Sequence, residues 1–389
     1  MASKERTRKV RRVKKATGEY FDYNILIIVA LLIIFGLIMI YSTSSYNALN
    51  EKGDANFYLK RQGISVLAGI VVMGLATFFP MRWIMGLSEL IYFVSLAAVF
   101  LVMSPLGRAE GGAARWIYIG PVSVQPAELV KISVIVLLAA LICKQKNSAL
   151  LNRWKILGAY MVPSGIGALL IFVITNNLSS AIIVLGIAFI MLFVASPNYS
   201  KFFAFMGGVL VAGAIAVLLI VNLANSTNGD FRVVRVLAWL DPEAYANGKG
   251  YQILQSLYAI GSGGVFGKGL GESMQKLGFI PESQNDMIFS IICEELGLCG
   301  AFMLIFLYGL LLWRLMLVAI NTRDKASCLV VVGVIAHIAI QVVLNIAVVT
   351  NSIPNTGISL PFISYGGSSV VCLMLEMGLV LNVSRNIKV

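Results

Sequence analysis

The sequence predicts an all-α polytopic membrane protein with about ten transmembrane helices, both termini cytoplasmic and a large extracytoplasmic loop between helices 7 and 8. Three observations lead to this class. Charged residues make up 12% of the chain, about half the share of a soluble domain. The mean hydropathy is +0.88. Apolar runs recur from end to end, so no separate soluble domain is left over.

Residues 1–22 form a basic arm that precedes the first apolar run, and they hold eight Lys and Arg side chains. Basic residues next to a membrane helix attract anionic lipid, at roughly 1 kcal/mol each. We therefore expect the net charge of +12 to interact with anionic lipid at the membrane surface, and we expect no nucleic-acid partner. No small-residue cleavage site follows the arm, which argues against a secretory signal.

Ten apolar windows follow the arm, and each approaches the roughly 20 residues that a bilayer core requires. They cover 23–41, 63–79, 84–103, 127–143, 156–174, 178–195, 202–223, 286–317, 328–349 and 366–383. Residues 23–389 are therefore expected to form a single membrane domain. With the N-terminus inside, 19 Lys and Arg fall in cytoplasmic segments and ten in outer segments, which agrees with the positive-inside rule.

Two outer segments stand out between these windows. The shorter covers 104–126, and the longer, 224–285, is the largest polar region of the chain. Long loops in compact folds are usually functional or disordered. Trp239, Tyr245 and Tyr251 lie among short apolar stretches of the longer segment, which favours an ordered loop. Its stretch GSGGVFGKGLG lacks the order of a phosphate-binding P-loop, and we interpret it as turns at the membrane surface.

Four carboxylates surround the start of the eighth window, in the stretch GFIPESQNDMIFSIICEELG. Asp286 opens the window, where an aspartate is most often a helix N-cap but can also act as a base whose pKa partial burial raises. Glu282 is interpreted as a solvated or paired loop acid. Glu294 and Glu295 lie roughly 12–14 Å further along the helix, too far for a close pair with Asp286. An ionised side chain at that depth costs at least ~3 kcal/mol, so both are expected to support the structure through partners.

Other polar residues lie inside the apolar windows. Glu128 and Lys131 are three residues apart, the spacing of an ion pair on one helical face. This pair either braces the fourth helix, or Lys131 tunes a carboxylate or lines a cavity; the spacing leaves both open. His337 is interpreted as a polar contact in the core. The five cysteines lie in or beside apolar windows and are interpreted as core thiols, not as a disulfide frame or a metal site.

Three segments, 114–131, 235–300 and 353–369, resemble the SEDS family, named for shape, elongation, division and sporulation. They contain ARWIYIGPVSVQPAELVK, SQNDMIFSIICEELG and IPNTGISLPFISYGGSS, and the resemblance covers nearly the whole chain. Within this family of FtsW, RodA and SpoVE proteins, the basic arm and GESMQKLGF resemble the FtsW/SpoVE division and sporulation branch more than RodA. The chain departs from the family's usual patterns at 175–180, Gln284, Asn351 and Asn355.

The resemblance implies an inverting peptidoglycan glycosyltransferase that uses a lipid-pyrophosphate-linked sugar donor. Such enzymes polymerise lipid II, the undecaprenyl-pyrophosphate-linked disaccharide-pentapeptide, into β-1,4 glycan strands on the outer face of the bacterial cytoplasmic membrane. They work beside a class B penicillin-binding protein, a transpeptidase, and with other divisome proteins, which implies a place at the division septum. Asp286 stands at the position of the family's catalytic carboxylate. Its implied role is that of a general base on the GlcNAc 4-hydroxyl group.

The resemblance also implies substrate-binding residues, because the two pyrophosphate groups of such substrates require cations. The arginine fork matches phosphate geometry better than lysine does. The predicted set comprises Arg115, Lys131, Arg232, Arg235, Lys268, Lys276, Ser364, Tyr365 and Gly366. A divalent cation, Mg²⁺ or Mn²⁺, could share this work, although no cluster of ligands in the sequence demonstrates a metal site.

Two other functions compete with the polymerase. A lipid II flippase would also suit ten helices with charges inside the membrane, and a scaffold would recruit a transpeptidase without chemistry of its own. A flippase is expected to expose polar groups on both faces, whereas the cytoplasmic segments here are short and basic. The large outer loop and the boundary position of Asp286 therefore favour chemistry on the outer face.

Overall fold

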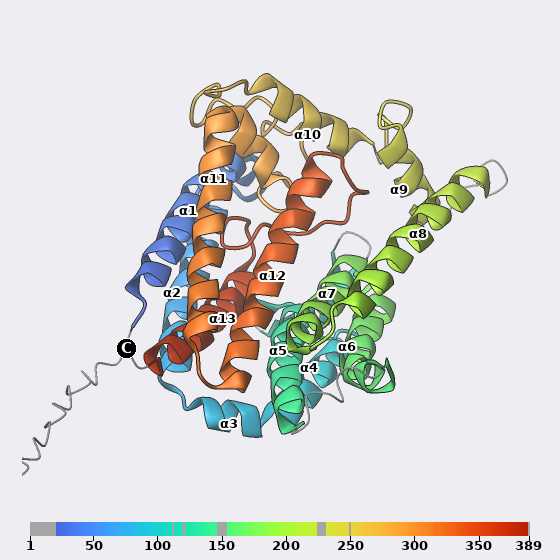
Figure 1. Cartoon of the computed structure of the whole chain (residues 1–389). Helices are drawn as coiled ribbons and strands as arrows, with labels where there is room; N and C mark the ends of the chain where they lie inside the picture. The colour runs from blue at the N-terminus through green and yellow to red at the C-terminus, as the bar shows by residue number, and fades with distance from the viewer. Residues whose placement is uncertain are drawn as a thin grey trace, which may run out of the picture.

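The computed structural model describes residues 21–110, 113–119, 122–145, 154–223, 231–248 and 250–387, which form a helical bundle with one small sheet (Figure 1). The helices are α1 (Tyr23–Lys52), α2 (Phe57–Phe78), α3 (Met81–Gly86), α4 (Ser88–Leu101), α5 (Pro126–Lys144), α6 (Trp154–Thr175), α7 (Leu178–Ala195), α8 (Ser200–Leu223), α9 (Phe231–Leu240), α10 (Tyr251–Ser262), α11 (Ile288–Asn321), α12 (Lys325–Val349) and α13 (Gly367–Arg385). The strands are β1 (Gly107–Glu110), β2 (Ala113–Ile119) and β3 (Val122–Val124). Residues 1–20 of the predicted basic arm lie outside the described residues.

Eight helices of the described chain are long and apolar enough to cross a membrane: α1, α2, α5, α6, α7, α11, α12 and α13. The predicted class of helical, polytopic membrane protein is confirmed at this level. The other two predicted windows correspond to α8 and to α3 with α4, so the number of ten helices and their topology stay predictions. Between α3 and α4, Leu87 has a φ of −94° and a ψ of 5°, and it interrupts the third window.

Three helices, α5, α12 and α13, form the centre of the bundle. In their most apolar stretches 83%, 67% and 78% of the residues are buried, against 28% in α6 and 33% in α2. Small residues allow helices in membranes to approach closely. A Cβ atom added at Gly378 of α13 would lie 2.5 Å from the carbonyl oxygen of Met73 in α2, so only glycine permits this contact. The outer helices therefore turn much of their apolar surface towards lipid.

The segment 104–126 forms an antiparallel sheet in the order β1-β2-β3, which the all-α prediction did not include. β2 is the central strand: its Ile117 pairs with Gly107 of β1 and with Val124 of β3. The sequence AARWIYI of β2 is rich in aromatic and β-branched residues, which favour strands. The last strand, β3, leads directly into α5, the helix with the largest buried share among the membrane spans of the described chain.

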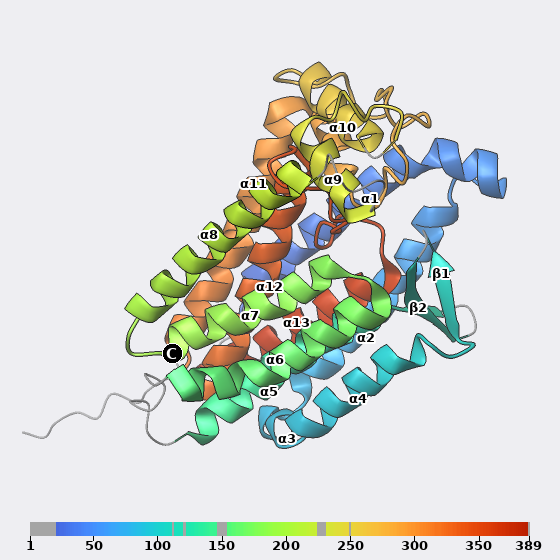
Figure 2. The same ribbon diagram turned by 90° about the vertical axis from the view of Figure 1, so that its right-hand side faces the viewer.

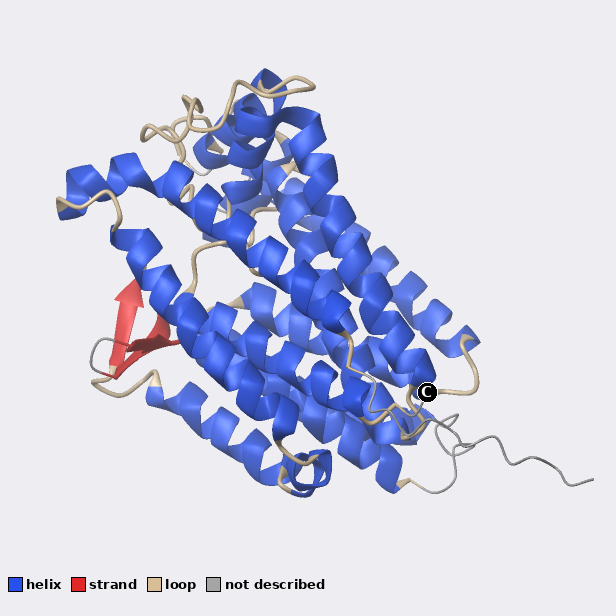
Figure 3. Cartoon of the chain, turned by 90° about the vertical axis from the view of Figure 1, so that its left-hand side faces the viewer, coloured by secondary structure: helices blue, strands red, loops and turns tan. Residues whose placement is uncertain are grey.

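The long loop between α8 and α11 covers one end of the bundle. Helices α9 and α10 lie at this end, opposite the C-terminus (Figure 1). The sheet also lies away from the C-terminus, as Figures 2 and 3 show from two sides. The described parts of the loop contain these two helices and a series of hydrogen-bonded turns that lead into α11. Loop and sheet together frame the end of the bundle at which Asp286 lies.

Candidate active site

Asp286 lies two residues before α11, where the outer loop joins the bundle. The helix begins at Ile288 and its N-cap residue is Met287, with no side chain capping the helix. The structure therefore does not show Asp286 as the N-cap that residue statistics favour. Its Oδ1 atom is buried without a hydrogen-bond partner among the described residues. Its Oδ2 atom faces Gly357, 3.6 Å from where a Cβ atom of that residue would stand.

The carboxyl group of Asp286 titrates far above an ordinary aspartate. Burial raises its pKa to about 7, and the charge of the nearby Glu282 adds to the rise. The backbone N–H groups of Asp286 and Met287, and the charge of Arg115, act in the opposite direction. A base with a pKa near the working pH is well matched to proton transfer, and shifts of this kind cluster at functional sites.

The charge of Arg115, in β2, acts on this carboxylate. It donates a hydrogen bond from Nε to the carbonyl oxygen of Thr175, at 3.4 Å, and one from Nη2 to that of Asn176, at 3.3 Å. Asn176 has a left-handed φ of 48°, which asparagine tolerates better than most residues. Burial lowers the pKa of Arg115, whereas the charges of Asp286 and Glu282 raise it. The turn between α6 and α7 therefore orients the guanidinium group near the two acids.

Arg235 of α9 lies close enough to Asp286 and Arg115 for both charges to act on it, and burial lowers its pKa. It lines a cavity of about 220 Å³ together with Trp239, Tyr251, Gln252 and Asn355. Arg232 belongs to the same helix, but its side chain lies outside the described part of the structure. Three separate segments thus contribute to one end of the bundle: β2 with Arg115, α9 with Arg235, and the approach to α11 with Glu282 and Asp286.

Three hydrogen bonds hold the backbone that carries Asp286. They run from Asn345 Nδ2 to Asp286 O at 2.8 Å, from Tyr365 N to Gln284 O at 2.9 Å, and from Ser283 Oγ to Thr43 O at 3.3 Å. Asn345 was not among the predicted site residues. An asparagine inside the apolar window of α12, 1% exposed in the structure, is the signal that could have indicated it.

The predicted residues Ser364, Tyr365 and Gly366 lie in the loop before α13, and each has a contact within the protein. Leu360 N donates to Ser364 Oγ at 2.7 Å, and Gly366 N donates to Gln62 Oε1 at 3.2 Å. The ring of Tyr365 packs edge-on against a tyrosine ring of α2, with 5.0 Å between the ring centroids. This loop therefore contacts both α2 and the segment that carries Asp286, and it connects the two.

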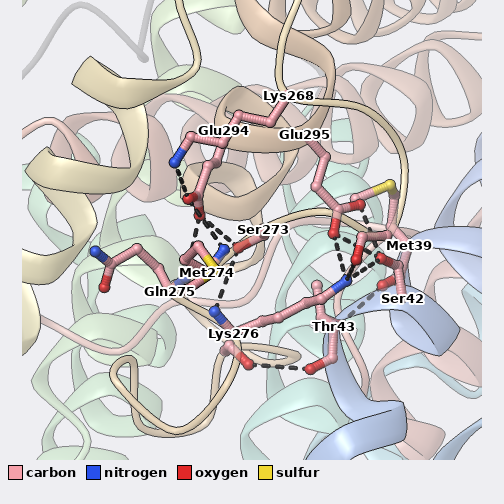
Figure 4. Close-up of polar contacts among 12 residues, drawn as sticks. Met39, Ser42, Thr43, Lys268, Ser273, Met274, Gln275, Lys276, Glu294 and Glu295 are labelled. Carbon is pink, nitrogen blue, oxygen red and sulfur yellow. Dashed lines mark hydrogen bonds and ion pairs between the residues drawn. The ribbon is translucent and has the colours of Figure 1, made fainter.

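The structure engages Lys268 and Lys276 in ion pairs of their own. Lys268 Nζ lies 2.6 Å from Glu294 Oε1, and Lys276 Nζ lies 2.8 Å from Glu295 Oε1 (Figure 4). Both glutamates are fully buried inside α11. The two lysines, predicted to bind pyrophosphate, thus compensate these buried charges, and the arginines are the cations that act on Asp286.

The bundle interior holds two further buried pairs. Lys131 Nζ lies 2.7 Å from Glu128 Oε1 in α5, as the spacing predicts. The Oε2 atom of Glu128 has no hydrogen-bond partner among the described residues. His337 Nδ1 of α12 lies 2.9 Å from the carboxylate of Glu376 in α13. Because a charge in the bundle interior is costly without its partner, each pair restrains the helices that carry it.

A metal site made by the protein alone does not fit these residues. Within the described ranges of the chain, no three His, Cys, Asp or Glu side chains come together in a way that could hold a metal ion. The acid nearest in effect to Asp286 is Glu282, which gives two carboxylates at most. Mg²⁺ is commonly held by one or two carboxylates only where substrate phosphates and water complete its ligands.

Long apolar helices around a buried core, with a carboxylate and arginines at one end, define a multi-pass membrane protein that has a polar site at the end of its bundle. The chain belongs to the family of cell cycle proteins FtsW, RodA and SpoVE, whose family model matches residues 22–389. The predicted membership of the SEDS family is thereby confirmed.

Relatives of known name support this placement along the full chain. The Stage V sporulation protein E of Bacillus subtilis (strain 168) is 38% identical over 370 residues, which cover 94% of this chain and 97% of that protein. A probable peptidoglycan glycosyltransferase FtsW of Trichlorobacter lovleyi is 35% identical over 376 residues, covering 95% of this chain and 94% of its own. Both belong to the branch that the sequence resembles.

Solved structures show the same fold. A chain from a study of the structural coordination of polymerization and crosslinking by a peptidoglycan synthase complex superposes with a TM-score of 0.74 at 28% identity, covering 94% of this chain and 98% of that one. The crystal structure of the rod shape determining protein RodA of Thermus thermophilus gives a TM-score of 0.66 at 25% identity and covers 94% of this chain and 97% of its own.

Proposed function

We propose that this chain is a peptidoglycan glycosyltransferase that polymerises lipid II into β-1,4 glycan strands on the outer face of the bacterial cytoplasmic membrane. The observation that carries the proposal is the buried Oδ1 atom of Asp286, which has no hydrogen-bond partner among the described residues, on a carboxyl group of pKa about 7 that interacts with the charges of Arg115 and Arg235. Relatives named probable peptidoglycan glycosyltransferase FtsW support the substrate class.

The proposed reaction uses Asp286 as a general base. Its carboxylate takes the proton of the acceptor's GlcNAc 4-hydroxyl while that oxygen attacks the anomeric carbon of the donor. The bond from this carbon to the donor's pyrophosphate breaks, and the undecaprenyl pyrophosphate leaves with the electron pair. A single displacement inverts the α-linked donor to a β-1,4 product, and Asp286 then releases its proton to water. A positioned base contributes typically about 10² to 10⁴-fold to such a rate.

The arginines are proposed to bind the pyrophosphate groups. Arg115 and Arg235 supply planar donors that suit phosphate oxygens, and they remain charged even where burial lowers their pKa. Stabilising the charge that develops on a leaving group is usually a large part of catalysis. A Mg²⁺ or Mn²⁺ ion in this reaction would take most of its ligands from pyrophosphate and water, because the described residues offer no group of three His, Cys, Asp or Glu ligands.

A class B penicillin-binding protein is the proposed partner, and other divisome proteins at the septum form the proposed setting. The likeness to a chain of a peptidoglycan synthase complex supports a partner that crosslinks strands. The relatives named for sporulation and for FtsW support a role in division or sporulation.

The test compares the wild-type protein with Asp286→Asn, each purified with its transpeptidase partner and given labelled lipid II. We expect Asp286→Asn to fold and to lose polymerisation by at least about 10²-fold, because the amide cannot accept the proton. The control is Asp241→Asn, an exposed aspartate of the outer loop whose turn an asparagine can preserve. Polymerisation by Asp286→Asn at near the wild-type rate would show that Asp286 is not the general base.

One observation keeps the flippase as a second candidate. The buried pairs Glu128–Lys131 and His337–Glu376 put ionisable groups inside the bundle, as a lipid-translocating protein also requires. Movement of lipid II across liposomes without glycan products would support this function. Equal complementation of a depletion strain by wild type and Asp286→Asn would instead support a scaffold.

A further inference from the structure

Helix α11 is interrupted at Gly297, and the outer loop forms backbone hydrogen bonds with the helix at this interruption. Gly297 has a φ of 67° and a ψ of −165°, which is not helical. Four backbone hydrogen bonds, each 3.0 Å long, join the loop to the helix on both sides of the break: Lys268 N to Glu294 O, Gly269 N to Glu295 O, Leu298 N to Gly264 O and Cys299 N to Val265 O. Groups that a continuous helix would pair internally are thus paired with the loop.

This contact explains why the stretch 261–271 is rich in glycine. A Cβ atom added at Gly267 would lie 2.1 Å from the carbonyl oxygen of Glu295, and one at Gly263 would lie 1.9 Å from that of Cys293. No side chain fits between two backbones at such distances. GSGGVFGKGLG is therefore a docking segment for the broken helix.

Two ion pairs with buried glutamates, Lys268–Glu294 and Lys276–Glu295, hold the loop beside this break (Figure 4). Glu294 accepts hydrogen bonds from Lys268 Nζ, from the hydroxyl of Ser273 and from the backbone N–H of Met274 at 3.2 Å. Lys276 Nζ donates to Glu295 Oε1 at 2.8 Å. Both carboxylates, although buried, are therefore supplied with donors from the loop.

Helix α1 braces the same arrangement. Ser42 Oγ lies 2.7 and 2.8 Å from the two carboxylate oxygens of Glu295, and Lys276 Nζ donates to Ser42 Oγ at 3.2 Å. The next residue of α1, Thr43, accepts the hydrogen bond of Ser283. Ser283 lies three residues before Asp286, so α1 holds the ion pair and the approach to the carboxylate together.

We propose that Lys268, Lys276, Glu294 and Glu295 are positioning residues, which lock the outer loop into the break of α11 and thereby fix Asp286 relative to Arg115 and Arg235. Glu294 lies six residues, about 9 Å, along α11 from Ile288, and Asp286 lies two residues before that start. Buried ion pairs contribute little net stability compared with apolar packing, and their better-attested use is to select one arrangement. The inference rests on the proposed function, because the role of the lock is to place the base.

The experiment uses the full chain with its transpeptidase partner and compares Lys276→Met with Lys276→Met/Glu295→Gln. The single variant leaves the Glu295 charge unpaired, whereas the double variant removes the charge and keeps the volume and the Ser42 contact. The control is Lys144→Met, which removes an exposed ion pair of 2.8 Å to Glu89. Thermal denaturation of each variant shows whether it is folded.

We expect both Lys276 variants to lose about 10- to 100-fold in kcat on lipid II, with a small change in KM, because a base displaced by about 1 Å loses rate by this order. The acidic limb of the pH profile should move to lower pH, since a loosened loop lets water reach Asp286. The other charges that act on this group, Glu282, Arg115 and Arg235, are unchanged in these variants. Amide hydrogen exchange of residues 279–290 should be faster in both variants than in Lys144→Met.

Three outcomes overturn the proposal. A double variant with the wild-type rate, pH profile and exchange would show that the pair only compensates charge. Failure of every variant to fold, including the partly exposed Lys268→Met, would make the pairs elements of stability alone. Amide hydrogen exchange of residues 279–290 that is the same in the Lys276 variants as in the wild type would overturn the proposal. This holds even if the wild-type protein shows no polymerisation. If the wild-type protein folds but does not polymerise lipid II, the proposed function is contradicted. Faster amide hydrogen exchange in the Lys276 variants would in that case still support the positioning of the loop by the ion pairs.

Discussion

At the scale of single residues, the proposed role of Asp286 as the base predicts how the reaction depends on pH. The base must be unprotonated to accept a proton, and its pKa is about 7. The rate should therefore fall about tenfold per pH unit below this value and level off above it. Initial rates of lipid II polymerisation across this range test the expectation. A rate that stays constant down to about pH 5 would contradict it.

The same profile reports on Glu282, whose charge is the second cause of the raised pKa, after burial. Glu282→Gln removes a like charge, so the acidic limb should move to lower pH while the plateau is retained. Glu243→Gln, an exposed acid of the same loop, is the matched control and should leave the limb in place. A limb that does not move in Glu282→Gln would show that this charge does not act on the base.

Asp286 should also reduce stability where it is ionised. Its pKa is higher in the folded protein than in the unfolded chain, so the folded state binds the proton more tightly and loses stability as the pH rises from about 4 to about 7. Asp286→Asn removes this cost. Its advantage in Tm over wild type should grow through that range and stay constant above it. An advantage that shrinks as the pH rises would contradict the sign.

At the scale of elements, the break in α11 makes a sharp prediction for one glycine. Gly297→Ala places a Cβ atom 2.4 Å from Gly267 N, at a φ of 67° that alanine rarely adopts. The substitution should cost about 3 kcal/mol or more of unfolding free energy. Gly309→Ala, on the same helix with nothing within 4 Å, should be neutral or stabilising by up to about 1 kcal/mol. Thermal denaturation in detergent compares the two, and equal Tm values would contradict the docking of the loop.

Helices and strands could be predicted from the sequence where a pattern within the segment itself determines them. The length of an apolar run indicates a span, because every backbone group in lipid must be paired within its own helix. The break at Gly297 depends on a loop some 30 residues earlier that supplies the missing hydrogen bonds, so no local pattern reveals it. The β1-β2-β3 sheet was missed for a similar reason, since its short strands are stable only through their mutual pairing.

The candidate site could be predicted in part for the same physical reason. Asp286 stands out as a carboxylate at the edge of an apolar window, and the pair Glu128–Lys131 follows from helical spacing. The partners of Lys268 and Lys276 could not be predicted, because Glu294 and Glu295 reach them only after the outer loop folds back onto α11. Charge and position alone made these lysines resemble a phosphate-binding rim.

At the scale of the whole molecule, the arrangement of the two ends leads to a topological prediction. The turn between α11 and α12 lies at the end of the bundle near the C-terminus, and the loop with α9 and α10 lies at the other end (Figure 1). The excess of Lys and Arg in the segments of the first end predicts that this end lies in the cytoplasm. The site of Asp286 should therefore face the outside, where a membrane-impermeant reagent can reach it.

The test uses a variant whose five free cysteines are replaced, with one cysteine introduced at an exposed position of either end. Asn247→Cys lies in the outer loop, and Arg323→Cys lies in the turn before α12. In intact cells an impermeant maleimide should label Asn247→Cys and not Arg323→Cys, and permeabilisation should make both react, which shows that the second thiol is reactive. The reverse pattern would put Asp286 on the cytoplasmic side, where lipid II polymerisation on the outer face could not use it, so this single measurement bears on the fold and on the proposed reaction together.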